Sequence, residues 1–304
     1  MEKSILFLVK VFYHMDNYGI LDIGKGSDIM RLHFKTNDYL LTWNLLFGAS
    51  FSRPIHEFKQ RLYKTHKRQY EIIQKDKKEM LSDIKNFIPD NDTLYNLVFE
   101  TELFNRLKQD SSKHRLELLK MWDQNKDKLN KDLKNTLRFN IKDDYNVIVL
   151  HPIMDSSLFE KGCCSIAWGY RTDLQDPYRT LTDITYFIVK NELSEYKKEY
   201  KDIVDVVLEL AKSELYTRLS GISNYKDGDK SLVFLKRQIY PFFLMYLGYD
   251  MDEFPGLMMR DGITFDIEKY PVKEELSKLN LLEFIDFCIR NQRNIINIKQ
   301  LEIV

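Results

Sequence analysis

The chain changes character near residue 140, and this change limits the folds that are open to it. From Pro54 to about residue 139 the sequence is rich in charged residues, with apolar residues that recur at helical spacing. Directly afterwards, Tyr145–Leu150 is rich in β-branched residues and ends at His151-Pro152, which is typical of a strand leaving a core. The chain therefore has to combine packed helices with at least one buried strand.

Three helices are predicted in the charged part of the chain. The first runs from Pro54 to about Lys85, and the second from Asp92-Thr93 to about Lys108. The third begins at about Ser112, and its apolar face consists of Leu116, Leu119, Trp122 and Leu129. The first fifty residues mix short apolar runs with turn signals, so they favour short strands or a mixture of strand and helix.

A strand and two helices are predicted after Pro152. The strand covers Cys163–Tyr170. Asp176 followed by Pro177 predicts a helix start, with aspartate as the N-cap and proline at the first helical position. A second helix spans about Lys201–Leu219 and stops at Ser220-Gly221.

Two further helices complete the prediction. Leu232–Leu247 is strongly apolar and aromatic, which favours a buried helix despite Pro241, and a last helix covers about Val272–Arg293. We therefore expect a mostly helical α+β protein. Residues 1–140 form a mainly helical N-terminal region, and residues 141–304 form a region in which helices pack on a small sheet.

Composition narrows the classes of partner and compartment. Lys plus Arg and Asp plus Glu both number 46, so no overall field attracts nucleic acid or an anionic membrane. Cys163 and Cys164 are adjacent and Cys288 is the third cysteine, a pattern that favours no disulfide framework and indicates a reducing, cytoplasmic compartment. No signal peptide is expected, and no apolar run reaches the length of a membrane-spanning helix.

The segment order over residues 145–221, strand, glycine-bearing strand, helix, helix, resembles the core of the zincin metallopeptidases, in particular the gluzincin branch. In that family the active-site helix carries His-Glu-x-x-His, whose histidines bind zinc and whose glutamate activates water, and a later helix supplies a third ligand. Here the corresponding position reads Thr182-Asp183-Ile184-Thr185-Tyr186, without either imidazole. The resemblance implies Asp183 in place of the general base and Glu209 or Glu214 in place of the third ligand.

The resemblance therefore implies a catalytically impaired, zincin-like module with no catalytic residue, no metal and no cofactor. Peptidase clefts bind extended chains by adding a strand to a sheet edge, and that mode of binding survives loss of the metal. We expect a protein or peptide partner in a groove along the second strand. The expected binding residues are Ser165, Trp168, Asp183, Tyr186 and Glu209. An ordinary amphipathic helix, in which Thr182 and Tyr186 simply pack, is the alternative interpretation.

Two other functions remain open, so the sequence does not decide whether the chain is an enzyme. An active hydrolase would assemble metal ligands from distant positions, such as His151 with acidic residues. A nucleic-acid-binding protein would use residues 53–78, where nine basic residues face three acidic ones and Tyr63 and Tyr70 are interleaved. A solvated helix face with pairs such as Glu71 with Lys75 explains the same basic segment.

Overall fold

The strand predicted over Tyr145–Leu150 is present as β2 (Asp144–Val149), an inner strand of a four-stranded sheet. The computed structural model describes residues 29–48, 52–83, 87–139, 141, 144–152, 157–159, 165–168, 176–222, 230–249, 272–293 and 295. The strand order is β1 (Arg31–Lys35), β2, β4 (Ser165–Trp168) and β3 (Ser157–Phe159). β1, β2 and β4 are parallel, whereas β3 is antiparallel to β4.

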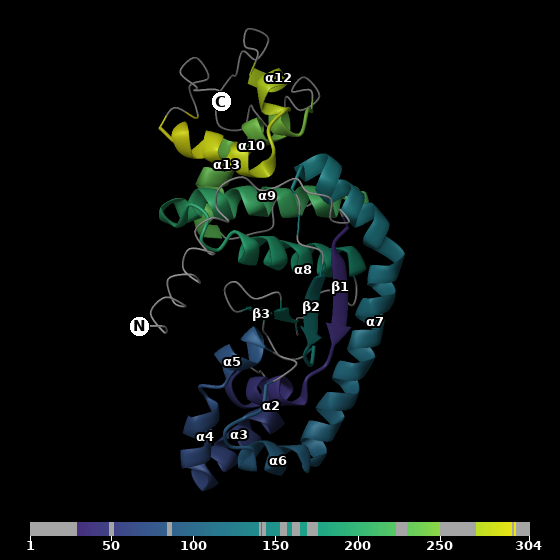
Figure 1. Cartoon of the computed structure of the whole chain (residues 1–304), viewed down its shortest axis with the longest axis vertical. Helices are drawn as coiled ribbons and strands as arrows, with labels where there is room; N and C mark the ends of the chain where they lie inside the picture. Colours follow the sequence, from purple (N-terminus) through teal and green to yellow (C-terminus); the bar gives the residue numbers. More distant parts are fainter. Residues whose placement is uncertain are drawn as a thin grey trace, which may run out of the picture.

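The helices surround this sheet in groups (Figure 1). Below the sheet in the view lie α2 (Asp38–Phe47), α3 (Arg53–Thr65), α4 (Lys67–Ile73), α5 (Lys77–Ser82) and α6 (Thr93–Phe99). Along one side runs α7 (Glu102–Asp132), which continues into a π-helical turn over Leu133–Leu137. Above the sheet lie α8 (Pro177–Glu192) and α9 (Lys201–Ser220), and beyond them α10 (Val233–Tyr246), α12 (Val272–Leu276) and α13 (Leu281–Arg290). Short 3-10 turns over Lys198–Tyr200 and Lys230–Leu232 precede α9 and α10.

Strand β2 is buried on both faces and separates two hydrophobic cores. Tyr145, Val147 and Val149 pack with residues of α7, α8 and α9, whereas Ile148 and Leu150 pack with residues of α2 to α6. Side chains alternate between the faces of a strand, so a strand with a core on each side is apolar along its length. This arrangement explains why Tyr145–Leu150 is such a clear strand signal in the sequence.

Helix α7 connects the two cores. Its 31 residues span roughly 46 Å at 1.5 Å per residue. Phe104 and Leu107 pack in the core of α2 to α6, and Trp122 and Leu129 pack in the core of α8 and α9. The predicted apolar face is wrong at Leu116, which is 56% exposed.

The predicted helix boundary between Lys108 and Ser112 is also wrong. The hydroxyls of Ser111 and Ser112 donate to the carbonyls of the residues four positions earlier, at 2.8 and 2.9 Å, so both serines lie inside the helix. The helix begins instead after Thr101, whose Oγ1 accepts the N–H of Phe104 at 3.3 Å. The predicted start at Ser112 therefore lies inside a longer helix, and Thr101 is its cap.

Two other predicted helices are divided in the structure. The segment from Pro54 to Lys85 forms α3, α4 and α5, with a break at His66 (φ −134°), and the three short helices turn Phe58, Ile73 and Met80 into one core. The last predicted helix is split at Asn280, which caps α13 through a reciprocal pair of hydrogen bonds with Glu283.

The mostly helical α+β class is confirmed. So are the cap at Asp176, the passage of α10 through Pro241, and the helix end at Gly221, which adopts φ +75°. β1 precedes residue 140 and pairs with β2, so the sheet is built from both sides of the predicted division. Cys288 is buried, whereas Cys163, Cys164 and the predictions for residues 1–28 lie outside the described residues. Within the described part of the chain, no helix combines the length and apolar character needed to cross a membrane.

Candidate functional site

Helix α8 is buried around most of its circumference, although it carries several polar residues. It contacts β3 and β4 on one side and packs along α9 on another. Thr182 and Thr185 are fully buried, and their hydroxyls donate to the carbonyls of Arg179 at 2.9 Å and Leu181 at 2.8 Å. Because these hydroxyls are satisfied within the helix, α8 can lie in the core without a water-filled pocket around them.

The start of α8 is tied to α9. Asp176 accepts the backbone N–H of Arg179 at 3.2 Å, and its second carboxylate oxygen accepts the phenol of Tyr216 on α9. One aspartate therefore both caps α8 and positions it against its neighbour.

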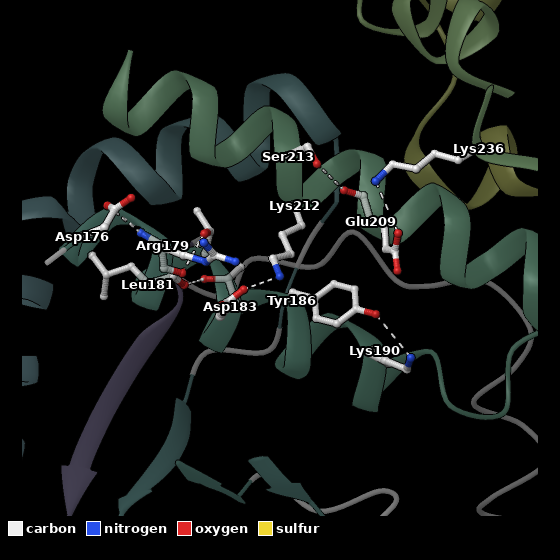
Figure 2. A network of polar contacts seen from close by, with 12 residues as sticks. Asp176, Arg179, Leu181, Asp183, Tyr186, Lys190, Glu209, Lys212, Ser213 and Lys236 are labelled. Atoms are coloured by element: carbon white, nitrogen blue, oxygen red, sulfur yellow. Dashed lines mark hydrogen bonds and ion pairs between the residues drawn. The ribbon is translucent and has the colours of Figure 1, made fainter. Parts of the chain in front are cut away.

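Polar side chains from α8 and α9 face each other between the two helices (Figure 2). On α8, Asp183 is followed by polar residues three and seven positions later, and on α9, Asp205 is followed by polar residues four and seven positions later. Such spacings place side chains on one helix face. We name this set the polar seam: Asp183, Tyr186 and Lys190 of α8, Asp205, Glu209 and Lys212 of α9, and Lys236 of α10.

Each carboxylate of the seam is paired with an ammonium group. Asp183 pairs with Lys212, and Lys190 lies 2.9 Å from Asp205. Asp183 lies in the first half of α8 and Lys212 in the second half of α9, whereas Lys190 lies near the end of α8 and Asp205 near the start of α9. The two helices are therefore antiparallel. Glu209 pairs at 3.3 Å with Lys236 of α10, and both side chains are nearly buried. Three ammonium groups and three carboxylates thus neutralise one another inside the helical layer.

Tyr186 lies in the middle of the seam. The ammonium groups of Lys190 and Lys212 lie 5.5 and 5.3 Å from the centre of its ring, within the range of cation–π attraction. Lys190 also donates to the Tyr186 hydroxyl at 3.3 Å. The ring is therefore held by cations that are themselves paired with Asp205 and Asp183.

The electrostatic surroundings keep Tyr186 neutral and Lys190 charged near pH 7. Burial raises the pKa of the Tyr186 phenol, Lys190 opposes that change, and Asp205 and Glu209 add to it. Burial alone would lower the pKa of Lys190, but Tyr186 and Asp205 outweigh it and raise the pKa. Neither group is set up to accept a proton, so the pair does not form a general base.

The structure brings three of the five predicted binding residues together. Asp183 and Tyr186 share one face of α8, and Glu209 of α9 is close enough to raise the pKa of Tyr186. Ser165 and Trp168 lie on β4, which is paired with β2 on one side and with β3 on the other. The predicted groove along β4 is therefore wrong, because its main chain is already used. β3, which the sequence did not reveal, is the end strand on this side of the sheet among the strands that the structure describes.

The donor set of the seam does not fit a zinc ion. Thr182 directs its hydroxyl to a backbone carbonyl, and Tyr186 contributes a neutral phenol where the family has imidazole. Asp183 and Glu209 are each neutralised by a lysine. Among the described residues, no group of three or more histidine, cysteine, aspartate or glutamate side chains is arranged to hold a metal.

His151 is the residue around which an active hydrolase is predicted to assemble its metal ligands. It follows β2 and is buried, and its Nε2 lies 3.4 Å from a carboxylate oxygen of Asp110 on α7. This contact joins the end of β2 to the first third of α7.

The sequence analysis missed the four remaining seam residues, Lys190, Asp205, Lys212 and Lys236. A sequence signal for three of these four residues is present. The acidic residues Asp183 and Asp205 and the basic residues Lys190 and Lys212 fall in complementary order if the two helices are antiparallel. Lys236 has no comparable signal, because lysine is seldom buried.

Searches of protein-family models, of curated proteins and of solved structures found no match to this chain.

Proposed function

We propose that the chain is a catalytically impaired, zincin-like module that binds an extended peptide without cleaving it. One observation carries the proposal. Asp183 and Tyr186 of α8 meet Glu209 of α9 at the positions where the resemblance expects a base and metal ligands, and lysine ammonium groups lie against both carboxylates. Positive charge that a metallopeptidase obtains from its metal is supplied here by Lys212 and Lys236.

The loss of hydrolysis follows from the protonation states in the seam. Peptide hydrolysis requires an activated water and a group that accepts its proton. Tyr186 is neutral because burial raises its pKa, and the ammonium of Lys212 is paired with Asp183, the residue in the position of the base. The seam holds the helices in place and leaves no base to activate water.

The peptide is proposed to bind along β3. An end strand offers unpaired main-chain N–H and C=O groups to an incoming strand, and strand addition gives affinity through the main chain. β3 (Ser157–Phe159) is antiparallel to β4 and contacts α8. A peptide added along β3 therefore lies beside the helix that carries Asp183 and Tyr186.

Selection followed by hydrogen exchange tests this proposal. Peptides that bind the full chain are first selected from a random library, and amide exchange is then measured with and without a selected peptide. We expect slower exchange at Ser157–Phe159, because these amides gain a neighbouring strand, and no change along α7, which serves as the internal control. Protection elsewhere with β3 unchanged contradicts the proposal, and so does a library that yields no saturable binder.

Mass spectrometry of the same peptide tests the catalytic part. The peptide is expected to remain intact after prolonged incubation with the protein and added zinc. Cleavage that a chelator abolishes contradicts the loss of hydrolysis.

A further inference from the structure

Aromatic side chains of α2, α3 and α4 contact one another in a continuous series. These helices lie at the opposite end of the molecule from α10 and α13 (Figure 1). The ring of Tyr63 contacts Tyr70 with a centroid distance of 5.4 Å, Tyr70 contacts Phe47 at 4.6 Å, and Phe47 contacts Trp43 at 5.2 Å. All four rings are partly exposed, and Tyr63 is 44% exposed. Exposed rings in sequence along a surface are the arrangement on which unpaired bases stack.

The rings are held in place by the backbone around them. The hydroxyl of Tyr70 donates to the carbonyl of Leu46 at 2.5 Å, and the indole N–H of Trp43 donates to the carbonyl of Gln74 at 3.3 Å. Ring positions fixed in this way reduce the entropy that a stacked ligand loses on binding.

Cations lie at both ends of this set of rings. The ammonium of Lys67 lies 5.9 Å from the centre of the Tyr63 ring, and that of Lys77 lies 5.6 Å from the centre of the Trp43 ring. Between residues 53 and 82 the chain has nine Lys or Arg residues and four Asp or Glu residues. This end of the molecule is therefore locally basic in a chain whose total charge is zero.

Four of these basic side chains, Lys64, Arg68, Lys75 and Lys78, are exposed and form no ion pair among the described residues. Lys64 and Arg68 follow Tyr63 and Lys67 directly in sequence, and Lys75 follows Gln74, which holds Trp43. The predicted pair of Glu71 with Lys75 is wrong, because Glu71 lies 3.9 Å from Lys67 instead. The charges of Lys64, Arg68, Lys75 and Lys78 are therefore available to a ligand.

Helix α7 shows the contrasting case of a solvated charged face. Arg106 pairs with Glu102, Lys113 lies 3.5 Å from Asp110, and Lys126 lies 3.0 Å from Asp123, each at helical spacing. Such pairs satisfy the charges within one helix. In α3 and α4, Arg53 and Lys67 form such pairs with Glu57 and Glu71. Lys64, Arg68, Lys75 and Lys78 form none among the described residues, so they can contact an external anion.

We infer that this surface binds single-stranded nucleic acid, with bases on the rings and phosphates on the unpaired cations. We name it the aromatic–basic surface: Trp43, Phe47, Tyr63, Lys64, Lys67, Arg68, Tyr70, Lys75, Lys77 and Lys78. A single strand is favoured over a duplex because its bases are free to stack on side chains, whereas duplex bases stack on one another. The surface lies on α2 to α5 and includes no residue of β3, so this inference does not depend on the proposed peptide site.

Fluorescence anisotropy with a labelled single-stranded oligonucleotide of mixed sequence, as DNA and as RNA, tests the inference on the full chain. Contact with four phosphates predicts that the logarithm of the binding constant falls with the logarithm of salt concentration with a slope of about −3. The variant Lys64→Ala/Arg68→Ala/Lys75→Ala should reduce this slope to about −1 and weaken binding at low salt at least about tenfold. Tyr63→Ala should weaken binding about fivefold or more with the slope unchanged, because it removes stacking and no charge.

A matched variant controls for the loss of total charge. Lys113→Ala/Lys120→Ala/Lys126→Ala removes three positive charges from α7 and should leave both affinity and slope as in the unaltered chain. Equal losses in the two triple variants overturn the inference. It is also overturned by a duplex of the same sequence that binds as tightly as the single strand, by polyglutamate that competes as well as the oligonucleotide, or by the absence of saturable binding at low salt.

Discussion

The polar seam and the aromatic–basic surface use the same residue types, lysine and tyrosine, in opposite ways. In the seam, each lysine lies against a carboxylate, and Lys236 and Glu209 are nearly buried together. On the surface, Lys64, Arg68, Lys75 and Lys78 are exposed and form no ion pair among the described residues, beside rings that are themselves partly exposed. Residue type alone does not assign a role here; the partner and the burial of each charge do.

The charges of the two regions should also differ in how much they affect the free energy of unfolding. A buried charge that loses its partner remains desolvated, so removing one member of a buried pair is costly. Exposed charges are hydrated and screened, and they contribute little to folding. Removing one charge of the seam is therefore expected to disturb the packing of α8, α9 and α10, whereas the surface charges contribute little to folding and can serve a ligand.

The largest expected effect comes from breaking the buried pair of the seam. Lys236→Met removes the ammonium that lies 3.3 Å from Glu209 and should lower the free energy of unfolding by about 3–5 kcal/mol. Urea unfolding followed by circular dichroism measures this change. The double variant Glu209→Leu/Lys236→Met removes both charges and should recover most of the loss, because no buried charge is left without its partner. A single variant that loses less than about 1 kcal/mol would show that this pair is hydrated like a surface pair.

A smaller effect is expected from the ring at the centre of the seam. Tyr186→Phe keeps the ring between Lys190 and Lys212 but removes the hydroxyl that accepts from Lys190. Loss of this hydrogen bond should cost about 0.5–1.5 kcal/mol in unfolding free energy at pH 7. Tyr63→Phe, the same change on the aromatic–basic surface, is the control and should leave stability unchanged.

The effect of Tyr186→Phe on the free energy of unfolding is expected to depend on pH. The pKa of Tyr186 is raised in the folded protein above its ordinary value of 10, so the folded state holds the phenolic proton more tightly than the unfolded state. The stability from this difference is fully present below pH 10 and is lost as the pH rises above 10 toward the folded-state pKa. Unfolding free energy should therefore decline less steeply above pH 10 in Tyr186→Phe than in the unaltered chain. If the unfolding free energy declines equally in both chains above pH 10, the pKa of Tyr186 is not raised by folding and its phenol is in contact with water.

The smallest effect is expected from the surface cations. Lys64→Ala, Arg68→Ala and Lys75→Ala should each change the free energy of unfolding by less than about 0.5 kcal/mol, because these side chains are exposed and form no ion pair. The comparison with Lys236→Met is made in the same urea titration. A loss of several kcal/mol from any of them would assign the surface charges a structural role and remove the contrast between the two regions.

The parts of the fold that were predictable have local causes. Asp176-Pro177 starts α8 through a hydrogen bond to Arg179, and Gly221 ends α9 with a left-handed conformation that glycine adopts without strain. β2 was found because it is buried on both faces. Strand β3 was not, because three residues carry too little pattern to distinguish a strand from a loop.

The parts that were not predictable depend on tertiary contacts. Ser111 and Ser112 resemble cap residues in sequence, and only their hydrogen bonds to the preceding turn show that the helix continues. Asp183, Tyr186 and Glu209 could be selected by resemblance. Their lysine partners could not, because a pairing between helices becomes visible only when the helix orientation is known.

Zinc binding, measured by elemental analysis after dialysis with zinc and removal of the free ion, tests the central claim most directly. The unaltered chain is compared with Thr182→His/Tyr186→His/Lys236→Met, which places two imidazoles four residues apart on α8 and removes the ammonium that lies 3.3 Å from Glu209. The account predicts no stoichiometric zinc on the unaltered chain and one equivalent on the variant. One equivalent on the unaltered chain would contradict the replacement of the metal by lysines, and a folded variant without zinc would contradict the zincin-like arrangement of α8 and α9.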